Sequence, residues 1–383
     1  MYKEIIHLIN QELTTGKIAG GQILYCKDGN INFRKCFGMA DREHSIPMQN
    51  DTIFRMYSMS KPITAVIAMK FWECRLFDLE DPISKFLPEY KEMTVITPSG
   101  LQKATTPIKI KDLLNMTAGI VYPGEISLAE LEMKKCFADI HAHIDSNTEY
   151  TTREVIKKIA DMPLAFQPST SWVYGLCADV LGGILEIIAQ KSLRDIFLEE
   201  LFLPLSMYDT DFYVPVDKQP RLAKLYCTEF HNGHSSLSVD NKRHLGLTFG
   251  LIPPKFESAG AGIFSTADDY AKFGMMLCGQ GHLGNVQILK PKTIRMMTQN
   301  QLTPAQLTAR EFLNDNNLHS RIYGYGFLMR QPRIAAECGW NGWSGTTFYA
   351  NAEQNSFFLY LVQASGYEKS NLEYQLSQYL SFP

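Results

Sequence analysis

The first forty residues alternate apolar and polar positions, first with a helical period and then with strand periods. Five apolar side chains recur at helical spacing in residues 2–14, namely Ile5, Ile6, Leu8, Ile9 and Leu13. Two strand-like runs, 21–26 and 31–37, then flank the turn Lys27-Asp-Gly-Asn30. Because a polar turn with Asp-Gly between apolar runs is a strong hairpin signal, this region predicts an amphipathic helix followed by two antiparallel strands.

The C-terminal region has a related pattern in the opposite order. Residues 346–349 and 356–362 are strand-like and flank the polar turn Asn-Ala-Glu-Gln-Asn. Residues 368–381 have the spacing of a helix that closes the chain. A helix and strands at each end, with helical patterns between them, predict that both ends share one sheet.

We therefore expect an α/β fold of the α+β type: an antiparallel sheet formed by the N- and C-terminal segments and flanked by helices, with a mainly helical second lobe. The predicted boundaries place residues 1–76 and 250–383 in a discontinuous sheet domain and residues 77–249 in the helical lobe. Clefts between two such lobes are common ligand sites, so we expect the chemistry there.

The composition indicates which kind of molecule the protein binds. Of the 383 residues, 45% are hydrophobic and 20% are charged, as in soluble globular proteins, and the formal net charge is −3. This balance lacks the basic surface that binds nucleic acid or an anionic membrane. We therefore expect a small-molecule ester or amide substrate, and neither nucleic acid nor a membrane as a partner. The composition leaves a monomer and a homo-oligomer equally open.

The N-terminal residues lack the apolar stretch of a secretory signal, and no apolar run reaches the roughly 20 residues that span a bilayer. We therefore expect a cytoplasmic protein. The eight cysteines are scattered without a Cys-x-x-Cys motif, so we interpret them as small buried apolar residues rather than a disulfide framework.

A candidate nucleophile lies at the start of a strongly apolar segment. Ser58 and Lys61 precede the run 63–76, which is apolar on almost every face and is expected to form a buried helix. Residues three apart share one helix face, so a buried lysine can help to remove the serine proton. The spacing alone is weak, since Ser-x-x-Lys occurs by chance about once in a chain this long. A helix-capping serine beside a solvated lysine is an equal alternative.

Two further segments contain residues of catalytic types. Tyr174 follows a turn-rich stretch near the start of a predicted helix, where a phenolate can accept a proton from serine; a core tyrosine is the alternative. Trp340, Asn341 and Gly342 precede a predicted strand, where glycine lets a substrate approach the backbone; an Asn-Gly hairpin turn is the alternative.

Taken together, these segments resemble the three motifs of the class C β-lactamase and penicillin-binding-protein superfamily of serine hydrolases. They are most similar to the motifs of the family VIII carboxylesterases. The ordered similarity extends over nearly the whole chain and includes residues 51–62, 79–88, 110–119 and 259–270.

The resemblance implies a catalytic group of three side chains: Ser58 as the acylated nucleophile, Lys61 as its partner one helical turn away, and Tyr174 as the phenolic base. It also implies an oxyanion hole made by the backbone N–H groups of Ser58 and Trp343, and no metal or organic cofactor. Four residues are expected to contact the substrate: Leu176, Trp340, Asn341 and Gly342.

Departures from the family motifs bear on the substrate. Trp340 stands where β-lactam-binding relatives have a cation, and Leu176 stands where they have an asparagine amide. Both changes favour a neutral carboxylic ester over a penicillin or a D-alanyl peptide, unless a cation such as Arg333 supplies the missing charge. Gly175 is expected to loosen the turn after Tyr174.

The predicted activity is hydrolysis of carboxylic esters through an acyl-enzyme, with acyl transfer to another alcohol as a variant. The alternatives are a β-lactamase, a D-alanyl-D-alanine carboxypeptidase or D-amino-acid peptidase, and a slow acylated sensor or non-catalytic module. A metal hydrolase is disfavoured because the histidine pairs have no zinc signature; these are His141 with His143 and His231 with His234. An α/β-hydrolase is disfavoured because the chain has no Gly-x-Ser-x-Gly motif.

Overall fold

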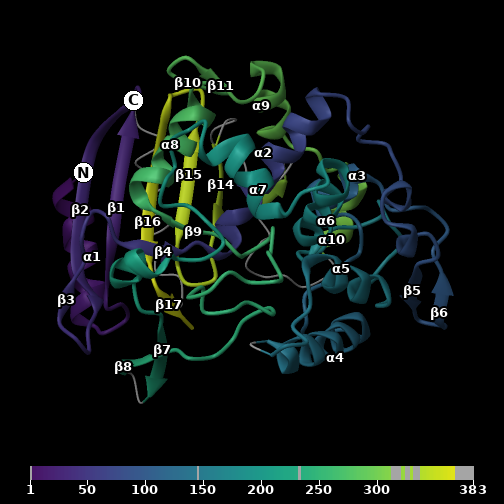
Figure 1. Cartoon of the computed structure of the whole chain (residues 1–383), viewed down its shortest axis with the longest axis horizontal. Helices are drawn as coiled ribbons and strands as arrows, with labels where there is room; N and C mark the ends of the chain where they lie inside the picture. The colour runs from purple at the N-terminus through teal and green to yellow at the C-terminus, as the bar shows by residue number, and fades with distance from the viewer. Residues whose placement is uncertain are drawn as a thin grey trace.

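A sheet forms one side of the molecule and a group of helices forms the other (Figure 1). The computed structural model describes residues 2–144, 146–231, 234–311, 321–323, 328–330 and 337–366. Both ends of the described chain contribute strands to the sheet, and helices lie against it, which confirms the predicted fold class.

The two ends meet where β16 pairs antiparallel with β1, with Leu359 opposite Leu24. Every neighbouring pair in the sheet is antiparallel. From one edge to the other, the described strands are β12 (Arg321–Tyr323), β13 (Leu328–Arg330), β14 (Glu337–Asn341), β15 (Thr347–Asn351), β16 (Ser356–Val362), β1 (Gly20–Lys27), β2 (Asn30–Asp41) and β3 (Ile46–Pro47).

Strand β16 is buried along its whole length because helices cover both faces of the sheet. Successive side chains of a strand point to opposite faces. One set packs with helices α2 (Ser60–Glu73) and α8 (Ala267–Cys278) and consists of Phe357, Leu359 and Leu361. The other set packs with helix α1 (Tyr2–Thr14) and consists of Phe358, Tyr360 and Val362.

The remaining helices are mostly short, and several of them form the side of the molecule away from the sheet (Figure 1). They are α3 (Ile110–Asn115), α4 (Leu128–His143), α5 (Thr152–Ala160), α6 (Cys177–Ala189), α7 (Leu193–Phe197), α9 (Pro291–Met297) and α10 (Pro304–Glu311). The smaller sheets pair β4 (Ile53–Arg55) with β9 (Phe264–Thr266), β5 (Thr94–Thr97) with β6 (Gly100–Lys103), β10 (His282–Leu283) with β11 (Val286–Gln287), and β7 (Tyr226–His231) with both β8 (His234–Val239) and β17 (Ala364–Ser365).

The structure confirms the predicted N-terminal helix, the hairpin that follows it, the buried helix after Ser58, and the C-terminal hairpin. The predicted helix 368–381 lies outside the described residues. The division into residues 1–76 with 250–383 and residues 77–249 stays a prediction; β7, near the end of the middle segment, pairs with β17 in the last.

Two further expectations concern the state of the cysteines and the cellular location of the protein. All eight cysteines are free thiols, and five of them are buried, whereas Cys74 is exposed. Within the described ranges, no helix is long and apolar enough to cross a membrane. The cytoplasmic location stays a prediction.

Candidate active site

Ser58 lies in a single 3-10 turn, Tyr57–Met59, between strand β4 and helix α2. Tyr57 has a φ of 46°, in the left-handed region that a bulky side chain rarely adopts. This reversal places Ser58 at the N-terminal end of α2, where backbone N–H groups lack acceptors within the helix. The serine is 9% exposed, so it lies at the boundary of the core.

The Lys61 ammonium contacts the serine hydroxyl directly. Its Nζ donates hydrogen bonds to Ser58 Oγ at 2.9 Å and to the Gly260 carbonyl at 2.8 Å. The side chain is only 2% exposed. The centroids of three aromatic rings lie 5.6, 5.1 and 5.8 Å from Nζ, those of Tyr122, Tyr174 and Trp340 respectively. The cation is therefore held by neutral oxygens and ring faces, an arrangement in which cation–π attraction contributes.

Tyr174, in the turn before helix α6, reaches the same serine. Its hydroxyl donates to Ser58 Oγ at 2.7 Å, and Trp340 Nε1 donates to the Tyr174 oxygen at 3.4 Å. Burial alone raises the pKa of Tyr174, but the Lys61 charge and the hydrogen bonds with Ser58 and Trp340 outweigh it and lower the pKa of this phenol below 10. The environment thus favours phenolate, the form that can accept a proton.

The turn after Tyr174 is tightly packed, which corrects the expectation that Gly175 loosens it. A Cβ on Gly175 would lie 2.0 Å from the carbonyl oxygen of Ile120, so only glycine fits. The next residue, Leu176, is 1% exposed and belongs to the hydrophobic core at the start of α6. Its expected contact with substrate stays a prediction.

The third motif forms the end of β14 and the turn into β15, as the hairpin alternative predicted. Gly342 has no room for a side chain, because a Cβ would lie 2.0 Å from the Thr346 hydroxyl and 2.5 Å from the Met56 carbonyl. The Thr346 hydroxyl donates to that carbonyl at 3.2 Å. The glycine therefore packs this turn against the backbone that leads to Ser58. Contacts of Asn341 and Gly342 with substrate stay predictions.

Trp343 follows in the same turn and is 39% exposed. Its ring stacks on His244 at a centroid distance of 4.1 Å and meets the edge of Tyr57 at 5.4 Å. Burial, and then the charge of Lys61, lower the pKa of His244 to about 4, so this imidazole is neutral near pH 7. The structure thus brings Trp343 next to the residue before Ser58, while the oxyanion role of its N–H stays a prediction.

Sequence reasoning missed Asp179, which positions the carbonyl that holds Lys61. Its buried carboxylate accepts hydrogen bonds from the Ser258 hydroxyl at 2.6 Å and from the Gly260 N–H at 3.1 Å. Burial raises the pKa of Asp179, although the Ser258 hydrogen bond and the Lys61 charge oppose this effect. One signal was present in the sequence: Asp179 is the only charged residue in the first nine residues of an apolar helix.

The histidine pairs weighed as metal ligands have other contacts where their side chains are described. The His141 ring accepts a hydrogen bond from the Gly246 N–H at 2.8 Å, and the His143 ring lies 2.8 Å from the Asp139 carbonyl. The side chains of His231 and His234, and the whole of Arg333, lie outside the described residues. Within the described part, no group of three His, Cys, Asp or Glu residues is arranged to hold a metal ion.

Comparisons with known proteins identify the family and the fold. A sequence model of the family described as Beta-lactamase matches residues 5–378. The protein Rv1367c of Mycobacterium tuberculosis is 30% identical over 348 residues, which cover 85% of this chain and 81% of that protein. Esterase EstB of Burkholderia gladioli is 26% identical over 275 residues, which cover 68% of this chain and 66% of that protein.

A solved structure extends the similarity to the whole fold. EstCE1, described as a hydrolase with promiscuous acyltransferase activity, has a TM-score of 0.81 and 23% identity, and the match covers 100% of this chain and 98% of that chain. The fold and the family match define the class as serine hydrolases and acyltransferases with the β-lactamase fold. The chain belongs to the Beta-lactamase family, which confirms the resemblance expected from its motifs.

We expect Gly175→Ala to disturb the site, because the new methyl group meets the Ile120 carbonyl. Overpacking of this kind costs about 1–3 kcal/mol in the free energy of unfolding and displaces Tyr174. Urea denaturation and kcat with p-nitrophenyl butyrate measure the two effects. Gly124→Ala is the matched control, since the atom nearest to its new methyl group is a side-chain oxygen of Glu130 and not a backbone carbonyl. Wild-type stability and kcat in Gly175→Ala would show that the close approach is unimportant.

Proposed function

We propose that this protein is a carboxylesterase that forms an acyl-enzyme on Ser58. The observation that supports it most strongly is the convergence of Lys61 Nζ and the Tyr174 hydroxyl on Ser58 Oγ, at 2.9 and 2.7 Å. A serine hydroxyl becomes a useful nucleophile only when a neighbouring group removes its proton. The esterase name of the EstB relative supports an ester substrate.

In the acylation step, Tyr174 acts as the base. As phenolate it accepts the proton of Ser58, and the serine oxygen forms a bond to the ester carbonyl carbon. Lys61 remains an ammonium ion and stabilises both the phenolate and the serine oxygen through its charge. Tyr174 then returns the proton to the alcohol oxygen as the carbon–oxygen bond of the ester breaks.

Deacylation repeats these proton transfers with water. Tyr174 accepts a proton from water, whose oxygen bonds to the acyl carbon, and Ser58 leaves and is reprotonated. An alcohol in place of water gives acyl transfer. The N–H groups of Ser58 and Trp343 are proposed to hold the carbonyl oxygen, where the loss of one donor costs about 100- to 1000-fold in rate.

The choice of esters over β-lactams depends on the third motif. Trp340 supplies no cation there, and its N–H is directed to the Tyr174 oxygen at 3.4 Å. Leu176 is buried in the core and offers no amide to an acylamino side chain. At these two positions a penicillin therefore finds neither a cation for its carboxylate nor a side-chain amide for its acylamino group.

We expect Ser58→Ala to abolish turnover of p-nitrophenyl butyrate, and a fluorophosphonate to label Ser58 in the wild type. Mass spectrometry of peptides locates the adduct. Ser60→Ala is the control, because this buried hydroxyl instead accepts from the Ile263 N–H at 3.2 Å. An adduct on Ser344 would contradict the assignment, and a single acylation without turnover would favour the sensor alternative.

We expect kcat/KM to rise with pH through the lowered pKa of Tyr174 and then level off, because the deprotonated phenol is the active form. In Lys61→Met the charge that lowers this pKa is absent, so the rising limb moves to higher pH. Lys292→Met, an exposed change on α9, keeps the wild-type profile. An unmoved limb in Lys61→Met would contradict the role of its charge.

A further inference from the structure

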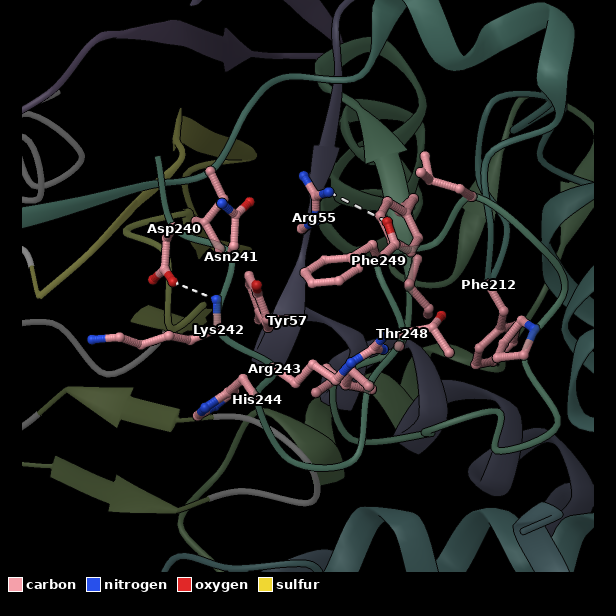
Figure 2. A pocket seen from close by; sticks show the side chains of 18 of the residues that line it. Arg55, Tyr57, Phe212, Asp240, Asn241, Lys242, Arg243, His244, Thr248 and Phe249 are labelled. Carbon is pink, nitrogen blue, oxygen red and sulfur yellow. Dashed lines mark hydrogen bonds between the residues drawn. The ribbon is translucent and has the colours of Figure 1, made fainter. Parts of the chain in front are cut away.

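A cavity of about 310 Å³ adjoins the proposed acylation site (Figure 2). Its walls come from the end of β4, from residues 239–256, and from residues 261–264 at the start of β9. This volume lies at the lower end of the range of small-molecule pockets, about 300–1000 Å³.

The side chains that line this cavity include more cations than anions. Four cationic side chains line it, those of Arg55, Lys224, Lys242 and Arg243, against the single carboxylate of Asp240. That carboxylate already accepts hydrogen bonds from the Ser365 hydroxyl and the Lys242 N–H. Lys224 pairs with Asp41 outside the cavity at 3.0 Å, and His244 on the wall is neutral. A net positive potential in a confined space favours an anionic ligand.

Arg55 is a cation of this cavity that has no carboxylate partner among the described residues. Its guanidinium donates to the carbonyls of Ala223 and Phe249, at 2.9 and 3.3 Å, and lies 5.7 Å from the centroid of the Phe264 ring. Across the described residues it forms no ion pair with a carboxylate. The side chain is half-buried, and this burial lowers the pKa of Arg55. Two carbonyls use only part of its five N–H donors, and a bound anion would offset the cost of the buried charge.

Much of the remaining cavity wall is apolar. Four phenylalanine rings contribute to it, those of Phe212, Phe249, Phe256 and Phe264. A small inorganic anion would leave these rings facing empty space or water. A carboxylate attached to an apolar body satisfies both kinds of wall, because the body displaces water from the rings while the carboxylate reaches the guanidinium.

Three residues connect this cavity to the proposed chemistry. Tyr57 on its wall immediately precedes Ser58, and Ala261 follows Gly260, whose carbonyl holds Lys61. His244 on the wall stacks on Trp343 at 4.1 Å. Figure 2 shows Tyr57 and His244 among the side chains around the cavity, together with Arg55 and Arg243. The cavity wall is therefore formed in part by the neighbours in sequence of Ser58 and of Gly260.

We propose that this cavity binds the carboxylate end of the substrate, so that the preferred ester carries an anionic group on an apolar chain. The inference rests on the proposed esterase function, and it replaces the expected neutral ester with a monoanionic one. Arg55 makes the ion pair, and the phenylalanine rings cover the chain.

The kinetic test compares matched esters that differ in charge. The anionic substrates are mono-p-nitrophenyl esters of adipic, pimelic and suberic acids, and the neutral ones are the methyl-terminated esters of equal length. Since a charge-assisted hydrogen bond is worth about 10- to 100-fold, we expect kcat/KM to favour the best anionic ester by that factor. In Arg55→Gln, which keeps N–H donors for the two carbonyls but has no charge, the ratio falls to about one. Arg295→Gln, an exposed change on α9, keeps the wild-type ratio.

A binding test separates the cavity from the catalysis. In Ser58→Ala, calorimetry should show octanoate bound at least about tenfold more tightly than octanamide, and this preference should disappear when Arg55→Gln is added. Equal binding of octanoate and octanamide, or a wild-type kinetic ratio near one, would overturn the anionic site even if neutral esters are hydrolysed. Preferential octanoate binding without turnover of any ester would instead overturn the proposed esterase while supporting the site. If Arg55→Gln fails to fold, inhibition of the wild type tests the site: octanoate should inhibit hydrolysis of p-nitrophenyl butyrate at least about tenfold more strongly than octanamide, and equal inhibition would overturn the anionic site.

Discussion

The hydrogen bond from the Lys61 ammonium to Ser58 Oγ is the contact around which the site is arranged. A cation that is 2% exposed requires compensation, and the described residues supply it through a carbonyl at 2.8 Å and three aromatic rings within 6 Å. Asp179 supports that carbonyl by accepting a hydrogen bond from the Gly260 N–H. Because none of the described carboxylates forms an ion pair with Lys61, its charge remains available to lower the pKa of Tyr174.

The need to enclose Lys61 and Ser58 explains why segments that are distant in the sequence pack closely around them. Gly175 brings the Tyr174 turn against the Ile120 carbonyl, and Gly342 brings the third motif against the Met56 carbonyl. Each glycine lets two backbone segments approach closely because it has no side chain. The first contact fixes the turn after Tyr174, and the second fixes the third motif. Trp340 occupies the place of a cation in related motifs, and here its ring and N–H both contact Tyr174. The third motif therefore supports the base of the proposed reaction.

Much of this arrangement could be predicted from the sequence, because it depends on local patterns. The strand-like apolar run beside a polar turn predicted β16 and its hairpin, and the three-residue spacing predicted that Lys61 reaches Ser58. The ordered motifs predicted that Tyr174 lies beside Ser58. The residue pattern alone indicated a core tyrosine. The contacts that depend on tertiary packing were not predictable. Nothing local shows that Gly175 faces Ile120, that Asp179 holds Gly260, or that Arg55 lines a cavity.

The central claim is that Lys61 and Tyr174 act as one unit on the proton of Ser58. A double-mutant cycle on kcat/KM with p-nitrophenyl butyrate tests it, using Lys61→Met, Tyr174→Phe and the double variant. General-base contributions are about 100- to 10,000-fold, and groups that share one proton transfer are strongly non-additive. The account predicts that the double variant loses little more than the worse single variant. If the two losses multiply, the residues act independently and the shared-base mechanism is contradicted.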